Sequence, residues 1–254
     1  MSTILIAGDS WGIGTYVQNG DKWDPTGQGI QSILEGLGHT VINISKGGGS
    51  NWLMIDRLED RWGNFSRCKY GVDPAERKDI AWNKVDHVVF LQTDIFREQF
   101  LYEEAIGWQK VLDHDFAKSL LKHDSLEQMI DGYFLKFYTA LNSIGQRHNK
   151  KILCLGCWSR LHPSIINYSN LISVIPSAVQ FLLPQLEEDV YLSDPEWYSQ
   201  LANDPTFMDK FGAEFKTMTI HATNKLELLY STWHEVHPDI DGYQQIVDVL
   251  VKKV

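Results

Sequence analysis

Four short apolar runs are the feature that most limits how this chain can fold. They lie at Thr3–Ala7, Thr40–Ile44, His87–Leu91 and Lys151–Leu155. None of them alternates cleanly between apolar and polar residues, which is the pattern of strands covered on both faces in a parallel sheet. Helical patterns separate the runs, so the sequence predicts a doubly wound α/β fold.

Three segments between and after these runs carry the spacing of amphipathic helices. Residues 28–37 form an apolar stripe that stops at Gly38, a common position for glycine after a helix. Ser125 opens a longer helix, in which apolar residues recur every three or four positions as far as Ile144. The last helix is expected from residue 242 to about residue 252.

The length of 254 residues suits one large domain, and no internal repeat or linker divides the chain. Two stretches do not follow the alternation of strand and helix. Residues 96–124 are acidic and aromatic, and residues 158–219 carry five prolines. We therefore expect a single domain over residues 1–254, with insertions at 96–124 and 158–219 over the edge of the sheet, where substrate loops sit.

The charge balance limits the partners that this chain is expected to bind. It has 23 Lys and Arg residues against 33 Asp and Glu residues, which gives a formal net charge of −10. This balance argues against nucleic-acid binding by phosphate neutralisation and against anionic membrane surfaces. No apolar run approaches the roughly 20 residues of a membrane helix, and the N-terminus lacks the basic region of a signal peptide. We expect a cytoplasmic protein with no nucleic-acid or membrane partner.

The three cysteines, at positions 68, 154 and 157, form no disulfide framework. Cys154 and Cys157 have C-x-x-C spacing, but they lie in an apolar run that is predicted to be a strand. Odd spacing on a strand directs two side chains to opposite faces, and no second pair completes a zinc site. We expect thiols in the core, with redox or metal chemistry as the alternative.

The sequence Gly-Asp-Ser-Trp-Gly at residues 8–12 directly follows the first apolar run. Active sites of doubly wound sheets lie at the carboxyl ends of the strands, where this segment is expected. Gly8 permits a tight turn, and Ser10 would stand near the amino end of a helix, where developing negative charge is favoured. The alternative is that Asp9 or Ser10 only caps that helix.

Three kinds of glycine-rich turn compete for this segment. A dinucleotide fingerprint requires G-x-G-x-x-G, whereas the glycines here are at positions 8, 12 and 14. A Walker loop requires Gly-Lys-Ser/Thr, which is absent from the sequence. The pattern G-x-S-x-G does match residues 8–12 and suggests the nucleophile elbow of α/β-hydrolases. In that fold, however, several strands and a glycine-rich loop precede the serine, whereas here one strand precedes Ser10 and Gly47–Gly49 follow it.

Four short blocks follow one another along the chain. They are ILIAGDSW at 4–11, VINISKGG at 41–48, VVFLQTDI at 88–95 and HEVHPDIDGY at 234–243. In this order they resemble the blocks of the SGNH (GDSL-type) hydrolases, a family of flavodoxin-like serine hydrolases. The resemblance implies a three-layer α/β/α fold with a mostly parallel central sheet.

The resemblance also implies catalytic positions. Ser10 holds the place of the nucleophile, His237 that of the catalytic histidine and Gly48 that of the oxyanion glycine. Such a serine attacks an ester carbonyl, the histidine takes its proton, and backbone N–H groups of the serine and the glycine bind the oxyanion. No cofactor is implied.

The third block departs from the family at the asparagine that donates a side-chain N–H to the oxyanion. The nearest residue is Asp94, and an ionised carboxylate there would repel the developing charge. Burial could keep Asp94 protonated. Thr93 and Asn51 are the other candidate donors.

The fourth block departs at the acid that orients the histidine, because His234 stands three residues before His237. Glu235, Asp239, Asp241 or a backbone carbonyl are candidates for that role. The same block is rich in metal ligands, but H-E-x-H differs from the zincin spacing H-E-x-x-H, and an EF-hand would need a distal glutamate. We expect a helix cap and no metal.

These features predict a serine hydrolase of the esterase or carbohydrate O-deacetylase type, with a small-molecule or glycan ester as substrate. Asp9, Asn51 and Thr93 are expected near the substrate, and Trp11 and Trp233 suit stacking on a sugar, with core packing as their alternative. The rival hypothesis is a catalytically weak or inactive SGNH-fold module that binds a glycan or a protein partner, such as a structural component of a phage located in the virion.

Overall fold

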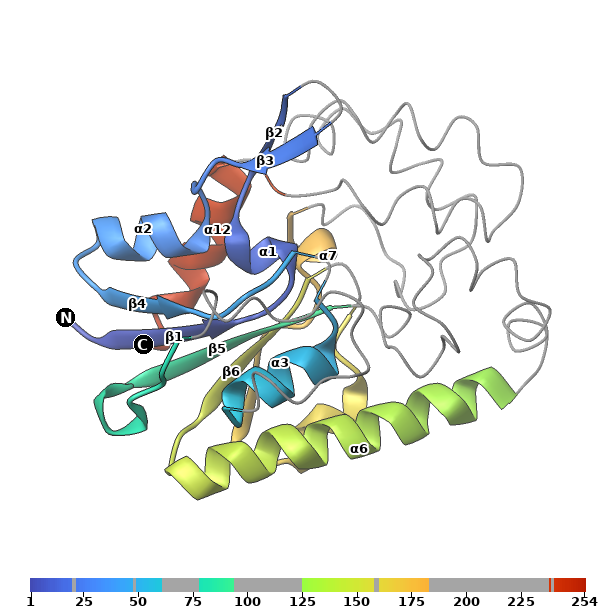
Figure 1. Ribbon diagram of the computed structural model, residues 1–254. Helices are drawn as coiled ribbons and strands as arrows, with labels where there is room; N and C mark the ends of the chain where they lie inside the picture. The colour runs from blue at the N-terminus through green and yellow to red at the C-terminus, as the bar shows by residue number, and fades with distance from the viewer. Residues whose placement is uncertain are drawn as a thin grey trace, which may run out of the picture.

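The computed structural model describes residues 1–19, 22–47, 49–60, 78–93, 125–157, 160–182, 238 and 240–254 (Figure 1). These residues form a three-layer α/β/α structure, in which a parallel sheet lies between two layers of helices. The flavodoxin-like fold class that the sequence predicts is confirmed.

The central sheet has five strands, and each adjacent pair is parallel. The strands are β1 (Thr3–Ala7), β4 (Thr40–Asn43), β5 (His87–Gln92), β6 (Ile152–Gly156) and β7 (Leu171–Ile175). Their order across the sheet is β4-β1-β5-β6-β7. The chain adds β4 on one side of β1 and all later strands on the other. The boundary between β1 and β5 is therefore the topological switch point of the sheet.

Two layers of helices cover the sheet (Figure 1). One layer contains α1 (Ser10–Ile13), α2 (Ile30–Gly36), α7 (Ala178–Leu182) and α12 (Ile240–Leu250). The other contains α3 (Asn51–Leu58), α6 (Ser125–His148) and the 3₁₀ helix η5 (Pro163–Asn167), and a second 3₁₀ helix, η2 (Trp82–Lys84), precedes β5. The aromatic residues Phe134, Phe137 and Tyr138 of α6 are fully buried against this side of the sheet. Because both faces are covered, the strands need no polar face, which explains their continuous apolar runs.

A separate antiparallel ribbon, β2 (Tyr16–Asn19) and β3 (Lys22–Pro25), projects away from the main sheet (Figure 1). Its two ends meet at one place. The Thr15 N–H donates to the Gln28 carbonyl at 2.6 Å, and the Thr26 N–H donates to the Thr15 carbonyl at 2.9 Å. The hydroxyls of Thr15 and Thr26 also form a hydrogen bond. The ribbon therefore leaves the fold directly after α1 and returns to the start of α2.

The sequence predicts four of the five strands and the helices α2, α6 and α12 to within a few residues. It misses β7, because Leu171–Ile175 fall in the stretch that we expected to be an insertion. The structure instead makes them the edge strand beside β6, so the insertion expected at 158–219 is wrong for these residues. The other expected insertion, 96–124, lies outside the described residues.

The buried thiols confirm the core interpretation of the second and third cysteines. Cys154 lies within β6 and Cys157 follows that strand, and both side chains are buried. Burial raises the pKa of the Cys154 thiol far above its ordinary value, which keeps the unreactive neutral form. Cys68 lies outside the described residues. Over the part of the chain that the structure describes, no helix has both the length and the apolar character needed to cross a bilayer.

The stacked pair of Trp82 and His148 makes stability depend on pH. The two rings lie 3.9 Å apart between centroids at an angle of 8°. Burial, followed by the positive charge of Arg147, lowers the pKa of His148 below its ordinary value of 6.5. The folded protein then binds fewer protons than the unfolded chain. The contribution of neutral His148 to the free energy of unfolding is fully present above pH 6.5. This contribution is lost as the pH falls through the lowered pKa.

We predict that lowering the pH from about 7.5 to about 5 reduces the free energy of unfolding less in His148→Phe than in the wild type. The phenyl ring retains the stacking on Trp82 but does not titrate. Urea unfolding followed by circular dichroism measures the difference at each pH. Equal pH dependence of the two proteins would contradict the assignment to His148.

Candidate active site

The switch point of the sheet brings together two segments that are distant in the sequence. β1 pairs with β5 from Ile4 beside His87 to Ala7 beside Phe90. The residues that follow these two strands therefore leave the sheet next to each other. In doubly wound sheets, ligands bind outside the carboxyl ends of the strands at this point.

Ser10 begins the single turn of α1 directly after β1. Asp9 is the N-cap of this turn, because its Oδ1 accepts a hydrogen bond from the Trp11 N–H at 3.0 Å. The capping interpretation therefore applies to Asp9, and Ser10 is the first helical residue, 8% exposed. Gly8 lets the turn lie against β5, since a Cβ atom at this position would stand 2.6 Å from the Cβ of Leu91.

The loop after β4 packs closely against the same turn. Asn43 Nδ2 donates to the Gly12 carbonyl at 2.6 Å and to Gln31 Oε1 at 3.0 Å. Asn43 Oδ1 accepts from the Ser45 N–H at 3.0 Å. A Cβ atom on Gly12 would lie 2.7 Å from the Cβ of Ser45, so the close approach of loop and helix requires glycine there. One buried asparagine thus joins α1, α2 and the β4 loop.

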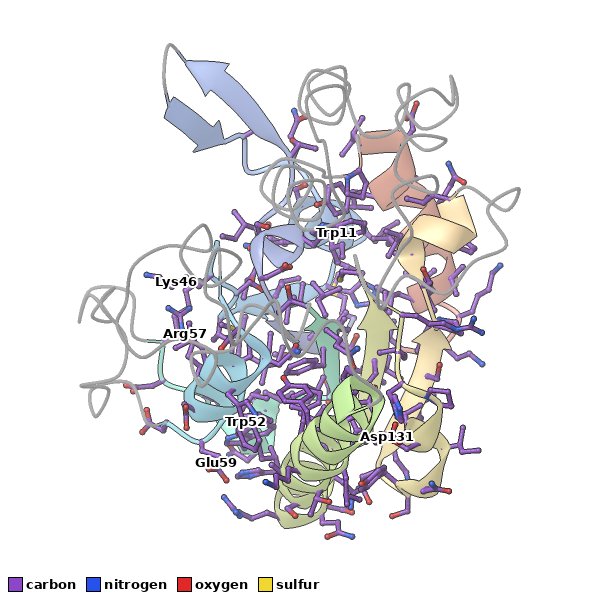
Figure 2. All side chains as sticks on the ribbon, turned by 90° about the vertical axis from the view of Figure 1, so that its right-hand side faces the viewer. Trp11, Lys46, Trp52, Arg57, Glu59 and Asp131 are labelled. Atoms are coloured by element: carbon purple, nitrogen blue, oxygen red, sulfur yellow. The ribbon has the colours of Figure 1, made fainter. Side chains whose placement is uncertain are left out.

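Two basic side chains hold the carbonyl groups of this loop. The buried Arg57 of α3 donates from Nη1 to the carbonyls of Ile44 at 2.6 Å and Ser45 at 3.3 Å. Lys78 Nζ donates to the Asn43 carbonyl at 2.7 Å. Figure 2 shows Arg57 and Lys46 on the same side of the molecule, beside α3. These contacts fix the path of the chain on the approach to the predicted oxyanion residue, Gly48.

A chain of buried hydrogen bonds runs from the Ser10 turn to α6. Thr93 Oγ1 donates to Asp9 Oδ2 at 2.8 Å. Asn51 Oδ1 accepts from the Thr93 N–H, and Asn51 Nδ2 donates to the Thr93 carbonyl, both at 2.9 Å. The other hydrogen of Asn51 Nδ2 goes to the Tyr133 hydroxyl at 3.0 Å. Asp9 and Asn51 are each 1% exposed and Thr93 is 2% exposed, so this chain lies beneath the surface.

Four residues that we predicted to contact substrate lie beneath the surface. Asp9, Asn51 and Thr93 are buried and are joined to one another by hydrogen bonds beneath the turn. Both amide hydrogens of Asn51 are used within the protein, which argues against Asn51 as the oxyanion donor. Trp11 is 2% exposed and belongs to the hydrophobic core, in the middle of the molecule in Figure 2. Core packing, the alternative for this tryptophan, is therefore correct.

Six predicted site residues lie outside the described residues: Gly48, Asp94, Trp233, His234, Glu235 and His237. The position of α12 nevertheless limits the path of the chain. Figure 1 shows both termini beside the edge at which β1 begins, so α12 starts at the opposite, carboxyl edge. Its contact with α7, which follows the end of β7, agrees with this direction.

A serine, a histidine and a carboxylate are linked by hydrogen bonds at η5. His162 Nε2 bonds Asp131 Oδ1 at 2.8 Å, and His162 Nδ1 bonds Ser164 Oγ at 2.8 Å. The Ser164 N–H also donates to the same Nδ1 at 3.3 Å, which makes His162 the N-cap of η5. This ring therefore caps a helix. Ser164 provides a control for experiments on Ser10.

Sequence reasoning missed the supporting roles of Tyr133 and Arg57. Tyr133 lies beside the apolar stripe of α6, and only the tertiary structure shows that its hydroxyl meets Asn51. Arg57 is a charged residue in a short helix that the sequence did not predict, and its burial has no local signal. Within the described ranges, no group of three His, Cys, Asp or Glu residues could hold a metal ion.

No protein-family model and no curated protein matches this chain. Among solved structures, it is similar to a lipase/acylhydrolase from Enterococcus faecalis, at 13% identity over 100% of this chain and 95% of the other, with a TM-score of 0.41. It is also similar to an alpha/beta hydrolase enzyme from the Lake Arreo metagenome (11% identity, 99% and 94% covered, TM-score 0.46). A member of the lipolytic G-D-S-L family from Veillonella parvula has 14% identity, 99% and 97% coverage and a TM-score of 0.36. At this distance these similarities assign no activity to the chain.

We predict that Asn43→Ala lowers the unfolding free energy by about 1–3 kcal/mol, because it leaves the Gly12 carbonyl and the Ser45 N–H without their partner. Urea unfolding measures the loss. Gln31→Ala is the matched control, since it removes one acceptor of the same amide together with the exposed bond to Glu35, and it should cost less than about 1 kcal/mol. Equal losses in the two variants would show that the bonds of Asn43 to Gly12 and Ser45 add no stability.

Proposed function

We propose that this protein is a serine hydrolase that cleaves carboxylic esters, with Ser10 as the nucleophile and His237 as the general base. The observation that carries the proposal is the position of Ser10. It stands on the first turn after β1, at the switch point of a flavodoxin-like sheet. The motif order in the sequence and the start of α12 at the same edge of the sheet support the pairing with His237.

In this mechanism, Ser10 Oγ attacks the ester carbonyl and His237 takes the hydroxyl proton. The alcohol leaves with a proton from His237, and an acyl group remains on Ser10. Water, activated by the same histidine, then releases the carboxylic acid. The backbone N–H groups of Ser10 and Gly48 stabilise the oxyanion in both steps. Glu235, Asp239, Asp241 or a backbone carbonyl orients the histidine, and the chemistry requires no cofactor or metal.

The substrate class in this proposal is a small-molecule or glycan ester, such as an O-acetylated carbohydrate. The polar loops and Trp233, near His237 in the sequence, suit a sugar. Trp11 no longer supports this class, because it packs in the core. The cell interior is the expected location, or the virion if the chain comes from a phage.

Ser10→Ala is predicted to abolish the hydrolysis of p-nitrophenyl acetate, because it removes the nucleophile. Loss of a triad member typically costs about 10⁴- to 10⁶-fold in kcat. His237→Ala should reduce the rate by a similar factor. Ser164→Ala, which removes the hydroxyl bound to His162, should retain wild-type turnover. Equal turnover by the Ser10→Ala variant and the wild type would reject the proposal.

The second candidate is a catalytically weak or inactive module that binds a glycan or a protein. Asp94 and His234 favour it, because they stand where the SGNH hydrolases have the oxyanion asparagine and the catalytic acid. The commitment of the Asn51 amide to other partners also favours it, because a candidate oxyanion donor is lost. Labelling with a fluorophosphonate separates the two functions. An activated serine reacts, and peptide mapping by mass spectrometry distinguishes Ser10 from Ser164.

A further inference from the structure

We propose that Thr93 is a positioning residue for Ser10, through the hydrogen bond from its hydroxyl to Asp9. This inference rests on the proposed function, because it concerns the rate at which Ser10 reacts. Thr93 contacts neither the substrate nor the reacting atoms in this scheme. It fixes the peptide between Asp9 and Ser10, whose N–H group is the expected oxyanion donor.

The first link is the contact between Asn51 and the backbone of Thr93. At the end of β5, the Asn51 side-chain amide accepts from the Thr93 N–H and donates to the Thr93 carbonyl, both at 2.9 Å. The amide thus makes the same pair of hydrogen bonds to Thr93 that the backbone of a neighbouring strand would make. The third bond of Asn51, to the Tyr133 hydroxyl, fixes the amide itself against α6. Thr93 is therefore held at both backbone polar groups.

The second link is the contact between Thr93 and the cap of α1. The Thr93 hydroxyl donates to Asp9 Oδ2 at 2.8 Å, and the remaining oxygen, Oδ1, accepts from the Trp11 N–H at 3.0 Å. Hydrogen bonds to an ionised acceptor are stronger than bonds between neutral groups. The two bonds hold the Asp9 carboxylate on either side. The Ser10 backbone lies between Asp9, which is the capping residue, and Trp11, whose N–H group is capped.

The bond from the Thr93 hydroxyl to Asp9 also excludes Thr93 as an oxyanion donor. The single hydrogen of this hydroxyl points to Asp9, so it is not available to an oxyanion. Asn51, the other candidate among the described residues, has no amide hydrogen left. Within the described part of the chain, the oxyanion then depends on main-chain N–H groups, whose direction is set by the turn. A small misplacement of such groups can cost about 10²-fold in rate.

The test compares Thr93→Val with Thr93→Ser. Valine has nearly the same shape but no hydroxyl, so we expect kcat for p-nitrophenyl acetate to fall about 10- to 100-fold while KM changes less than about threefold. The second-order rate of fluorophosphonate labelling at Ser10 should fall by the same factor. Serine restores the hydroxyl and should return both rates to within about threefold of the wild type. Thr139→Val, which removes an exposed hydroxyl on α6, is the matched control and should leave both rates unchanged.

A double variant tests whether Thr93 acts through Asp9. Asp9→Asn retains a cap oxygen but weakens the bond from the Thr93 hydroxyl. If the two residues act as one unit, Asp9→Asn combined with Thr93→Val should react no more slowly than the slower single variant. If the rate losses of the two single variants multiply in the double variant, the two residues act independently and Thr93 does not act through Asp9. Should Thr93→Val fail to fold by circular dichroism, a labelling rate of Asp9→Asn equal to the wild type would overturn it instead.

The outcomes also separate this inference from the proposed function. If the wild type is not labelled at Ser10, the proposed function is rejected and the positioning role is rejected with it. If the wild type is labelled and the valine variant reacts equally fast, Ser10 is the nucleophile and the role of Thr93 is wrong. A rise in KM with unchanged kcat would also overturn it, because it would mean that Thr93 acts on substrate binding.

Discussion

The burial of the three central parallel strands on both faces is the constraint on which the rest of this structure depends. The interior of β1, β5 and β6 is apolar almost without interruption, so both faces must be covered by helices. Each connection between parallel strands then has to run from the carboxyl end of one strand back to the amino end of the next. Polar residues can gather only where the strands end. The order of the strands decides which ends become neighbours, and here they are the ends of β1 and β5.

The described part of the fold could be predicted well wherever the pattern was local. The apolar runs mark β1, β4, β5 and β6, and the spacing of apolar residues marks α6 and α12. β7 was missed because only its end residues, Leu171 and Ile175, are buried, and because it lies in a proline-rich stretch. Ser10 could be found because its motif follows a strand directly. The bonds that join Asp9, Thr93 and Asn51 span up to 84 positions in the sequence, and no periodicity encodes them.

The polar groups beneath Ser10 also explain how a carboxylate can remain buried beside a predicted nucleophile. Burying a charge is costly unless hydrogen bonds compensate for the lost water. Asp9 meets this condition with one backbone donor and one hydroxyl donor. Asn43 does the same for the β4 loop, using its donor and acceptor groups on three different segments. The turn is thus held by the side chains of Asn43, at the end of β4, and Thr93, directly after β5, and Asn51 of α3 in turn holds Thr93.

The β2–β3 ribbon has a consequence for how this fold can vary. Its ends are joined by the bonds among Thr15, Thr26 and Gln28, so the ribbon is closed off from the sheet at its base. Closing a longer loop between fixed ends adds little entropic cost. A shorter, longer or foreign hairpin could therefore be grafted between Thr15 and Thr26 while α1 keeps its place. The molecule offers a site for exchanging a surface module directly downstream of Ser10.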